Sequence, residues 1–395
     1  MNIQETQSSE KIFTKSFFLI FGALLFTALV MYALMSTVTE YATSMGTTAT
    51  IAGLVSGIYI FGGLCSRIYS GNALERIGWK RTALIFMTIH FLACLLYFIV
   101  NDVTLLLIVR FIHGIGFGAS ANAIVTIATA ILPKKRFSEA FGYFMLGTTI
   151  AVGLGPYISG FLYDAVGSVG CFTVASVFSA IALLCMILID VGDQNSESDV
   201  EVPAKKENYS LFEKIFEYKA IPVSFFTALT SLGYVSILSF YRLYAAEVNL
   251  TTAFSWFFII YSIVLILSRP IAGKIQDNGG DRIVCVTGII AQTIGLFLIA
   301  WMPSVVTVLI CSVCCALGFG TLNSACTTIV TRNTSESRRP YAVSTFFIFC
   351  DATMGFGPAL LGSFVSSTTG YAPVYFISSF ITLLALPICL YALKK

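Results

Sequence analysis

Residues 66–81 read SRIYSGNALERIGWKR, a polar stretch that lies between two long apolar runs. The chain carries a second version of this stretch, SRPIAGKIQDNGGDR, at residues 268–282. The serines that open the two stretches are 202 residues apart (268 − 66 = 202), and the same offset relates Gly116 to Gly318. Because the offset holds far from the polar stretches, the chain is one unit written twice, and such a repeat decides the architecture.

The composition places both units in a membrane. The chain is 57% hydrophobic and 11% charged, whereas average soluble domains contain about 25% charged residues. A membrane-spanning helix needs roughly 20 predominantly apolar residues. Such apolar runs, six in each repeat, lie at 16–38, 48–70, 82–100, 104–131, 139–163, 169–190, 219–241, 251–272, 283–302, 305–330, 341–366 and 373–393. They are too long and too uniformly apolar for the strands of an outer-membrane barrel.

These runs predict an all-α integral membrane protein whose twelve transmembrane helices form two parallel six-helix repeats. Each half has an even number of helices, so both halves start on the same side of the membrane. The charged segment between them is typical of a solvated linker. We expect an N-terminal six-helix bundle at 1–190, a cytoplasmic linker at 191–218 and a C-terminal six-helix bundle at 219–395. The linker could end in a short interfacial helix at 211–218.

The distribution of basic residues predicts the orientation. Lys and Arg accumulate in short loops on the cytoplasmic side of a membrane. With both termini cytoplasmic, all but two of the 23 basic residues lie on that side. The two exceptions are Arg110 and Arg242. We therefore expect a multi-pass protein of the inner or plasma membrane with both termini in the cytoplasm.

Both polar stretches resemble the loop signature of the major facilitator superfamily, Gly-x-x-x-Asp-Arg-x-Gly-Arg-Lys. The residues that carry the resemblance are Gly71, Glu75, Arg76, Gly78 and Lys80 in the first copy and Gly273, Asp277, Gly280 and Arg282 in the second. Glu75 stands where the family has Asp, while Trp79 and Asn278 replace arginines. The resemblance implies that the two stretches are gating hinges, in which Glu75 and Asp277 help to latch the halves together on the cytoplasmic side.

Two further segments resemble signatures of the same family. Residues 110–116, RFIHGIG, are similar to its fourth-helix signature, and residues 153–160, GLGPYISG, to a fifth-helix signature associated with antiporters. The second segment recurs at the same offset, so this packing motif comprises Gly153, Gly155, Pro156, Gly160, Gly355, Gly357, Pro358 and Gly362. The resemblance covers the whole chain and is to the twelve-helix, proton-coupled drug and metabolite antiporters.

The hinge residues also have roles that follow from their chemistry. Glycines at 71 and 78 suit a tight turn because glycine adopts positive φ readily. A carboxylate at 75 can face the positive N-terminal end of a helix, and Arg76 and Lys80 can pair with acids or lipid phosphates. The alternative is that the basic residues only enforce the topology.

Arg110 lies inside an apolar run, where a charge is costly unless it faces an aqueous cavity or a partner. At helical spacing Arg110, His113 and Asn122 lie within one half of the circumference, so all three are candidate cavity residues. Arg110 could meet an anionic group or bias a nearby carboxylate, or it could snorkel to the headgroups. His113 could titrate near neutral pH or be a hydrogen-bonded packing residue, and His90 is expected to be structural.

Asp351 is the one carboxylate well inside an apolar run. It could carry protons, because desolvation raises the pKa of a carboxylate and hydration lowers it again. The alternative is a structural role at the seam between the halves, because Asp351 shares a helical stripe with small residues of the kind that pack helices together. Glu40 and Arg242 occupy equivalent positions in the repeats. They could form an ion pair that closes the outer vestibule, or lie separately in solvent, which we slightly favour.

Together these features predict a secondary active transporter that works by alternating access. The antiporter resemblance makes proton-coupled export of a small organic molecule the leading mechanism. The alternatives are a proton-coupled metabolite importer and a transport-inactive membrane sensor. We do not expect an enzyme or a metal site, because the chain has only two histidines and they are not paired with each other at metal-ligand spacing. We expect no cofactor beyond the proton motive force, and a monomer that interacts with a small-molecule substrate, protons and the lipid bilayer, without nucleic acid.

Overall fold

The computed structural model describes residues 11–133, 136–190, 217–335, 338–366 and 368–394. Within these ranges twelve helices are long and apolar enough to cross a membrane. The predicted all-α fold class and the predicted number of spans are therefore confirmed.

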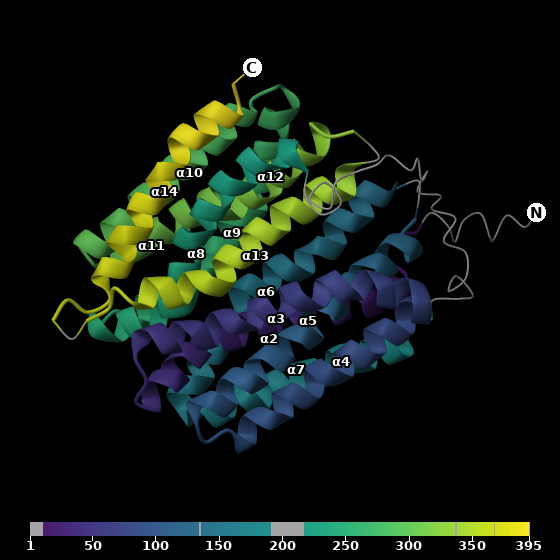
Figure 1. Ribbon diagram of the computed structural model, residues 1–395, viewed down its shortest axis with the longest axis horizontal. Coiled ribbons are helices and arrows are strands. Elements are labelled where there is room, and N and C mark those ends of the chain that lie inside the picture. Colours follow the sequence, from purple (N-terminus) through teal and green to yellow (C-terminus); the bar gives the residue numbers. More distant parts are fainter. Residues whose placement is uncertain (1–10, 134–135, 191–216, 336–337, 367, 395) are drawn as a thin grey trace, which may run out of the picture. The chain divides into compact units, whose positions relative to one another are not determined.

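The first repeat supplies six of these helices (Figure 1). In chain order they are α2 (Lys15–Ser44), α3 (Ala49–Ile77), α4 (Trp79–Leu96), α5 (Val103–Ile131), α6 (Phe137–Val166) and α7 (Ser168–Leu188). A 3₁₀ turn, η1 (Tyr97–Ile99), follows α4 directly.

The second repeat begins at a 3₁₀ turn, η3 (Tyr218–Ala220), and most of the predicted linker lies outside the described residues. Its helices are α8 (Ile221–Glu247), α9 (Thr251–Asp277), α10 (Asp281–Trp301), α11 (Val305–Cys315), α12 (Thr321–Arg332), α13 (Arg339–Gly362) and α14 (Ala372–Ala392). A π-helical turn, η4 (Ala316–Gly320), joins α11 to α12, so these three pieces form one span.

Equivalent residues start equivalent helices in the two repeats. The side chain of Asp102 accepts a hydrogen bond from the backbone N–H of Leu105 at the start of α5. Ser304, 202 residues later, accepts one from the N–H of Thr307 at the start of α11. Both side chains satisfy a backbone donor that a helix N-terminus leaves without an intrahelical partner.

Most of the first polar stretch is helical, although the sequence suggested a hinge between two spans. α3 continues to Ile77, so the predicted turn at Gly71 is wrong, whereas Gly78 breaks the helix with a φ of 87° as predicted. In the second copy the positive φ of 79° belongs to Gly279, while Gly280 has a φ of −86° and precedes α10. The second turn is longer because α9 ends at Asp277.

The helices group by their contacts into two units, residues 1–37 with 58–199 and residues 38–57 with 200–395. This division differs from the boundaries expected from the repeat, because the first turns of α3 pack closely against α13. A Cβ at Gly57 would overlap the backbone carbonyl of Gly355, and one at Gly362 would overlap that of Ala49. Small residues thus let these two helix backbones touch, as they do in other membrane proteins.

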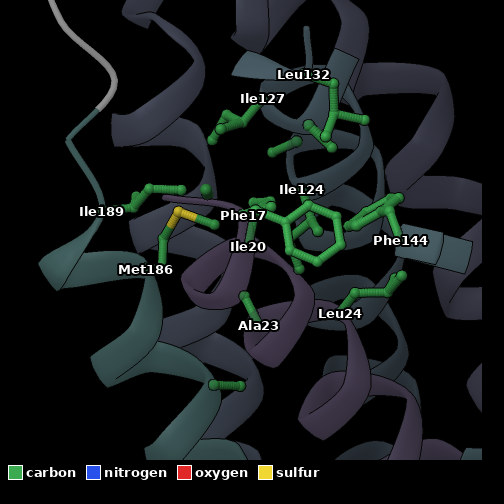
Figure 2. Packing of buried hydrophobic residues seen from close by; sticks show 14 of the residues in the cluster. Phe17, Ile20, Ala23, Leu24, Ile124, Ile127, Leu132, Phe144, Met186 and Ile189 are labelled. Atoms are coloured by element: carbon green, nitrogen blue, oxygen red, sulfur yellow. The ribbon is translucent and has the colours of Figure 1, made fainter. Parts of the chain in front are cut away.

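An apolar core lies in the first unit, where α2, α5, α6 and α7 meet (Figure 2). Phe17, Ile20, Ile124, Phe144 and Met186 are among its buried side chains. Lipid tails are as apolar as these groups, so close van der Waals packing rather than removal from water holds the helices together.

All eight residues of the predicted packing motif are buried. On α6, a Cβ at Gly155 would lie 2.9 Å from the Cβ of Tyr32 and 3.0 Å from the backbone N of Ala33, both on α2. On α13, a Cβ at Gly357 would lie 2.5 Å from a methyl carbon of Leu232 on α8. Each copy of the motif therefore sets the approach of the fifth helix of its repeat to the first.

Candidate functional site

The first unit holds a group of polar side chains in its interior, which we call the buried histidine cluster. It consists of His90 and Cys94 on α4, Tyr97 on η1, His113 on α5 and Ser179 on α7, all of them buried. Two further side chains, Arg110 of α5 and Tyr59 of α3, lie beside it. α4 and α5 are joined by a short turn, and their tight packing brings the cluster together.

His113 is at the centre of the cluster. Its Nδ1 is 3.0 Å from the hydroxyl of Tyr97, and its Nε2 is 3.5 Å from the Sγ of Cys94. The ring of His90 lies with its centroid 4.3 Å away, and that of Tyr59 lies 4.9 Å away in an edge-on arrangement. His113 is therefore not an isolated packing residue but part of a polar network.

Glycines make room for this network. A Cβ at Gly116 of α5 would lie 2.6 Å from the backbone N of His90, so only glycine lets α4 approach α5 this closely. A Cβ at Gly114 would overlap the backbone carbonyl of Tyr59 on α3. The Nδ1 of His90 in turn is 2.8 Å from the hydroxyl of Ser179 on α7. Side chains of the cluster thus connect α4, α5 and α7, and the ring contact between Tyr59 and His113 adds α3.

Arg110 is fully buried, with 0% of its surface exposed. Its guanidinium lies 4.4 Å from the centre of the Tyr59 ring, a cation–π contact. The side chain does not reach along the helix toward headgroups, so the structure does not show the snorkelling arrangement. A permanent positive charge in this interior can hold an anionic group or disfavour a second cation nearby.

The two histidines, which are not paired at metal-ligand spacing in the sequence, lie side by side in the structure with Cys94 next to them. One donor atom from each of His90, Cys94 and His113 lies within 4.8 Å of the other two. The sequence does contain a signal for the contact between His90 and His113, but spacing within one helix does not reveal it. His90 precedes Asn101 by 11 residues and His113 follows Asp102 by 11 residues, so the two histidines face each other once the helices fold back antiparallel.

Asn122 lies further along α5 and is half-buried. Its backbone carbonyl accepts a hydrogen bond of 2.9 Å from the hydroxyl of Thr126. It shares the helix with Arg110 and His113 but does not belong to the cluster.

Glu40 of α2 and Arg242 of α8 form an ion pair within the second unit. The Nε of Arg242 donates to a carboxylate oxygen of Glu40 at 2.6 Å. Their side chains are 26% and 12% exposed, respectively. The preference for two separate residues in solvent is therefore wrong, because the structure contains the ion pair.

Asp351 is half-buried on α13, at a level where its helix neighbours line a cavity. The cavity has a volume of about 420 Å³ and lies between α8 and α13. Its lining is almost entirely apolar and consists of Ile221, Phe225, Ala228, Leu229, Ile348, Phe349, Ala352 and Thr353. Asp351 is not itself a lining residue, although Ala352 and Thr353 of the same helix turn are.

The hinge residues have different environments. In the first hinge, Arg76 is exposed, and the ammonium of Lys80 donates to the carbonyls of Ile187 and Ile189 at 3.2 and 2.6 Å. Lys80 therefore stabilises the C-terminal end of α7, where a positive charge is favourable, a partner that the sequence did not indicate. The side chain of Glu75 lies outside the described part of the structure.

In the second hinge, Asp277 and Arg282 are exposed. The ionic contact seen there is made by Asp281, which pairs with Arg332 at the end of α12 and accepts a hydrogen bond of 3.1 Å from Gln276. The sequence analysis did not single out Asp281. Its signal is its position in the first turn of α10, where an acidic residue is favoured.

Known proteins resemble this chain along most of its length. The sequence profile of the Major Facilitator Superfamily matches residues 20–253 and 223–395. An uncharacterized MFS-type transporter of Methanocaldococcus jannaschii is 25% identical over 345 residues, which are 86% of this chain and 88% of that protein. The multi-drug resistance efflux pump PmrA of Streptococcus pneumoniae is 23% identical over 290 residues, 71% of this chain and 70% of the pump.

Solved structures share the fold. The crystal structure of the nucleoside transporter NupG superposes with a TM-score of 0.77 at 15% identity, covering 97% of this chain and 100% of that one. The profile match spans both repeats, and the twelve helices occupy the positions that the repeat predicts. The chain therefore belongs to the Major Facilitator Superfamily, as a transporter whose twelve helices cross the membrane.

Proposed function

We propose that this transporter exports a small organic molecule in exchange for protons, by alternating access. The observation that carries the direction of transport is the similarity to PmrA, an efflux pump, over 71% of the chain. The antiporter-type motif at Gly153, Gly155 and Pro156 supports the same direction. We further propose that the protein resides in the cell membrane with both termini in the cytoplasm, because this orientation follows the positive-inside rule.

Asp351 is the proposed proton carrier. It is half-buried in a span with a mean hydropathy of 1.3, and residues next to it line the apolar cavity between α8 and α13. An ionisable residue inside a membrane span is a candidate for proton transfer. Exchange requires that solute and proton compete: a solute that interacts with the ionised carboxylate is released when Asp351 is protonated, and loss of the proton allows the solute to bind again.

Purified protein in proteoliposomes tests the direction of coupling. With an acidic interior, an antiporter accumulates the solute as protons leave, whereas a symporter loses it. The probes are ethidium, a fluoroquinolone and a nucleoside, each measured with and without the pH gradient. We expect gradient-driven accumulation of at least one probe. Gradient-driven loss from preloaded vesicles would instead identify the protein as an importer, and no flux of any probe would contradict drug export.

Asp351→Asn keeps the size of the side chain and removes its ability to ionise. We expect accumulation driven by the pH gradient to fall to the level of empty liposomes, while the protein still elutes as a single species in detergent. The matched control is Asp102→Asn, which keeps the helix cap at α5 because Asn is as good an N-cap as Asp. Wild-type proton coupling in Asp351→Asn would exclude Asp351 as the carrier.

A further inference from the structure

We propose that His90, Cys94 and His113 form a buried binding site for a soft d¹⁰ metal ion, Cu(I) or Zn(II). Two imidazoles and a thiolate are the ligand types that these ions prefer. The three side chains come from α4 and α5 only, so a bound ion would fasten this helix pair from within. This site is separate from the proposed transport chemistry at Asp351, which lies in the other unit.

The distances between the donor atoms fit one ion. The Sγ of Cys94 and the Nε2 of His113 are 3.5 Å apart. Ligands bound to a single tetrahedral zinc through Zn–N bonds of about 2.0–2.1 Å and Zn–S bonds of about 2.3 Å are about 3.6 Å apart. The third donor, from His90, lies within 4.8 Å of both, so the three donor atoms are close enough together to approach one ion.

The second ring nitrogen of each histidine is already held in the way that metal sites require. The Nδ1 of His90 is hydrogen-bonded to Ser179 at 2.8 Å, and the Nδ1 of His113 to Tyr97 at 3.0 Å. When Nδ1–H donates to the hydroxyl in each pair, Nε2 carries the lone pair that faces the cluster. Metal-binding histidines almost always have such an oxygen partner on the other nitrogen, which fixes tautomer and orientation.

His90 provides an observation that packing alone does not explain. Its Nε2 is buried and has no hydrogen-bond partner among the described residues. A buried polar atom left in this way costs free energy unless something binds it. A cluster built only for packing would account for the bonds to Ser179 and Tyr97 but leave this nitrogen unsatisfied, whereas a metal ion uses it.

Charge balance favours Cu(I). Binding requires Cys94 to lose its thiol proton, which leaves with solvent, so the bound ion faces one negative charge and two neutral imidazoles. Cu(I) then gives a neutral site and Zn(II) a site of charge +1. Arg110 already places a positive charge against the rings next to the site, and an unbalanced charge is costly in a low-dielectric interior.

The test is metal binding by the full-length protein in detergent, without reference to transport. One equivalent of Cu(I), buffered by bathocuproine disulfonate without oxygen, is added to the protein, and a parallel sample receives Zn(II). X-ray absorption then gives the first coordination shell. We expect one ion per chain with two nitrogen ligands and one sulfur ligand. A shell containing only sulfur would place the ion at another pair of cysteines, such as Cys285 and Cys326, and would overturn the proposal.

Variants assign the ligands. We expect Cys94→Ser and His90→Ala to weaken binding by at least about tenfold, and Tyr97→Phe to weaken it by about tenfold through loss of the outer hydrogen bond. Cys171→Ser is the matched control, since Cys171 is buried in the same unit and its thiol donates to the carbonyl of Ser159 on α6. Zn(II) in the same two-nitrogen, one-sulfur shell would support the site. No bound ion in wild-type protein, or equal affinity in Cys94→Ser, would overturn it.

Discussion

At the scale of single residues, Gly370 shows how a backbone conformation and a charge constrain one position. Its φ of +60° is in the left-handed region, and a Cβ there would overlap the carboxylate of Glu247. That carboxylate accepts a hydrogen bond of 2.9 Å from the backbone N–H of Tyr371, at the start of α14. The glycine therefore keeps Glu247 in place as an anchor between α8 and α14.

Gly370→Ala should consequently lower the melting temperature of the protein in detergent. The left-handed conformation costs a non-glycine residue about 1–2 kcal/mol, and displacement of Glu247 adds the loss of its hydrogen bond. Gly46→Ala is the control, because Gly46 has a φ of +81° but nothing within 4 Å of its Cβ position. It should show the backbone cost alone. Equal melting temperatures in the two variants would contradict the role of Glu247.

At the residue scale, the sequence predicted those features that depend on the residues of a single helix. A charge inside an apolar run indicated that Arg110 needs an aqueous cavity or a partner, and in the structure it is buried with its guanidinium over the ring of Tyr59. The same reasoning assigned His90 a separate structural role, because helical spacing relates residues within a helix and not between helices. The contact between His90 and His113 depends on the register of α4 against α5, which Gly116 permits and which a pattern within one helix does not contain.

At the scale of elements, the π-helical turn η4 depends on a side chain from another helix. Gln292 of α10 is fully buried, its carbonyl oxygen accepts from the backbone N–H of Phe319 at 2.9 Å, and its amide donates to the carbonyl of Thr230 at 2.8 Å. Gly318 has a ψ of −116°, outside the helical region. A helix broken at this point leaves backbone groups without intrahelical partners, and Gln292 satisfies one of them.

Gln292→Leu should therefore destabilise the turn by about 1–3 kcal/mol, the cost of leaving buried polar groups unsatisfied. Hydrogen exchange measured by mass spectrometry should show faster exchange at Phe319. Thr287→Val, on the same helix, serves as control because the Thr287 hydroxyl is exposed and bonds carbonyls of its own helix. Unchanged protection at Phe319 would show that the turn does not need Gln292.

The ends of elements were predictable only where local chemistry determines them. Gly78 breaks the helix, as its position in the motif suggests, and Asp102 and Ser304 cap helices at equivalent places. The predicted turn at Gly71 was wrong, and the sequence analysis did not predict the break in the tenth span at Gly318. The sequence around Gly318 matches that around Gly116, which lies in an unbroken helix, so the difference comes from the partner: His90 in the first repeat, Gln292 in the second.

At the scale of the molecule, duplication explains which sites correspond and which have diverged. Positions 90 and 292 are related by the repeat offset (292 − 90 = 202), and each contacts the equivalent glycine on the next helix, Gly116 or Gly318. In one copy this position belongs to the buried histidine cluster, and in the other it supports a bent helix. Equivalent contacts in the two repeats therefore have different roles.

Glu40 and Arg242 are also equivalent positions (242 − 40 = 202), and here the two equivalents bind each other. If this ion pair closes the outer vestibule in the proposed transport cycle, transport requires one acidic and one basic side chain at these two positions. Which position carries which charge should then matter little. Glu40→Arg and Arg242→Glu should each reduce proton-driven flux of the transported probe, and the double exchange should restore it.

Thermal unfolding of the same variants separates gating from stability. A partly exposed ion pair contributes about 0–1 kcal/mol, so the melting temperatures should change little. Loss of flux in both single variants with recovery in the double variant, at nearly constant stability, is the result expected of a gate. If the double exchange stays inactive although the protein remains folded, the two residues act separately, and closure of the vestibule does not depend on their pairing.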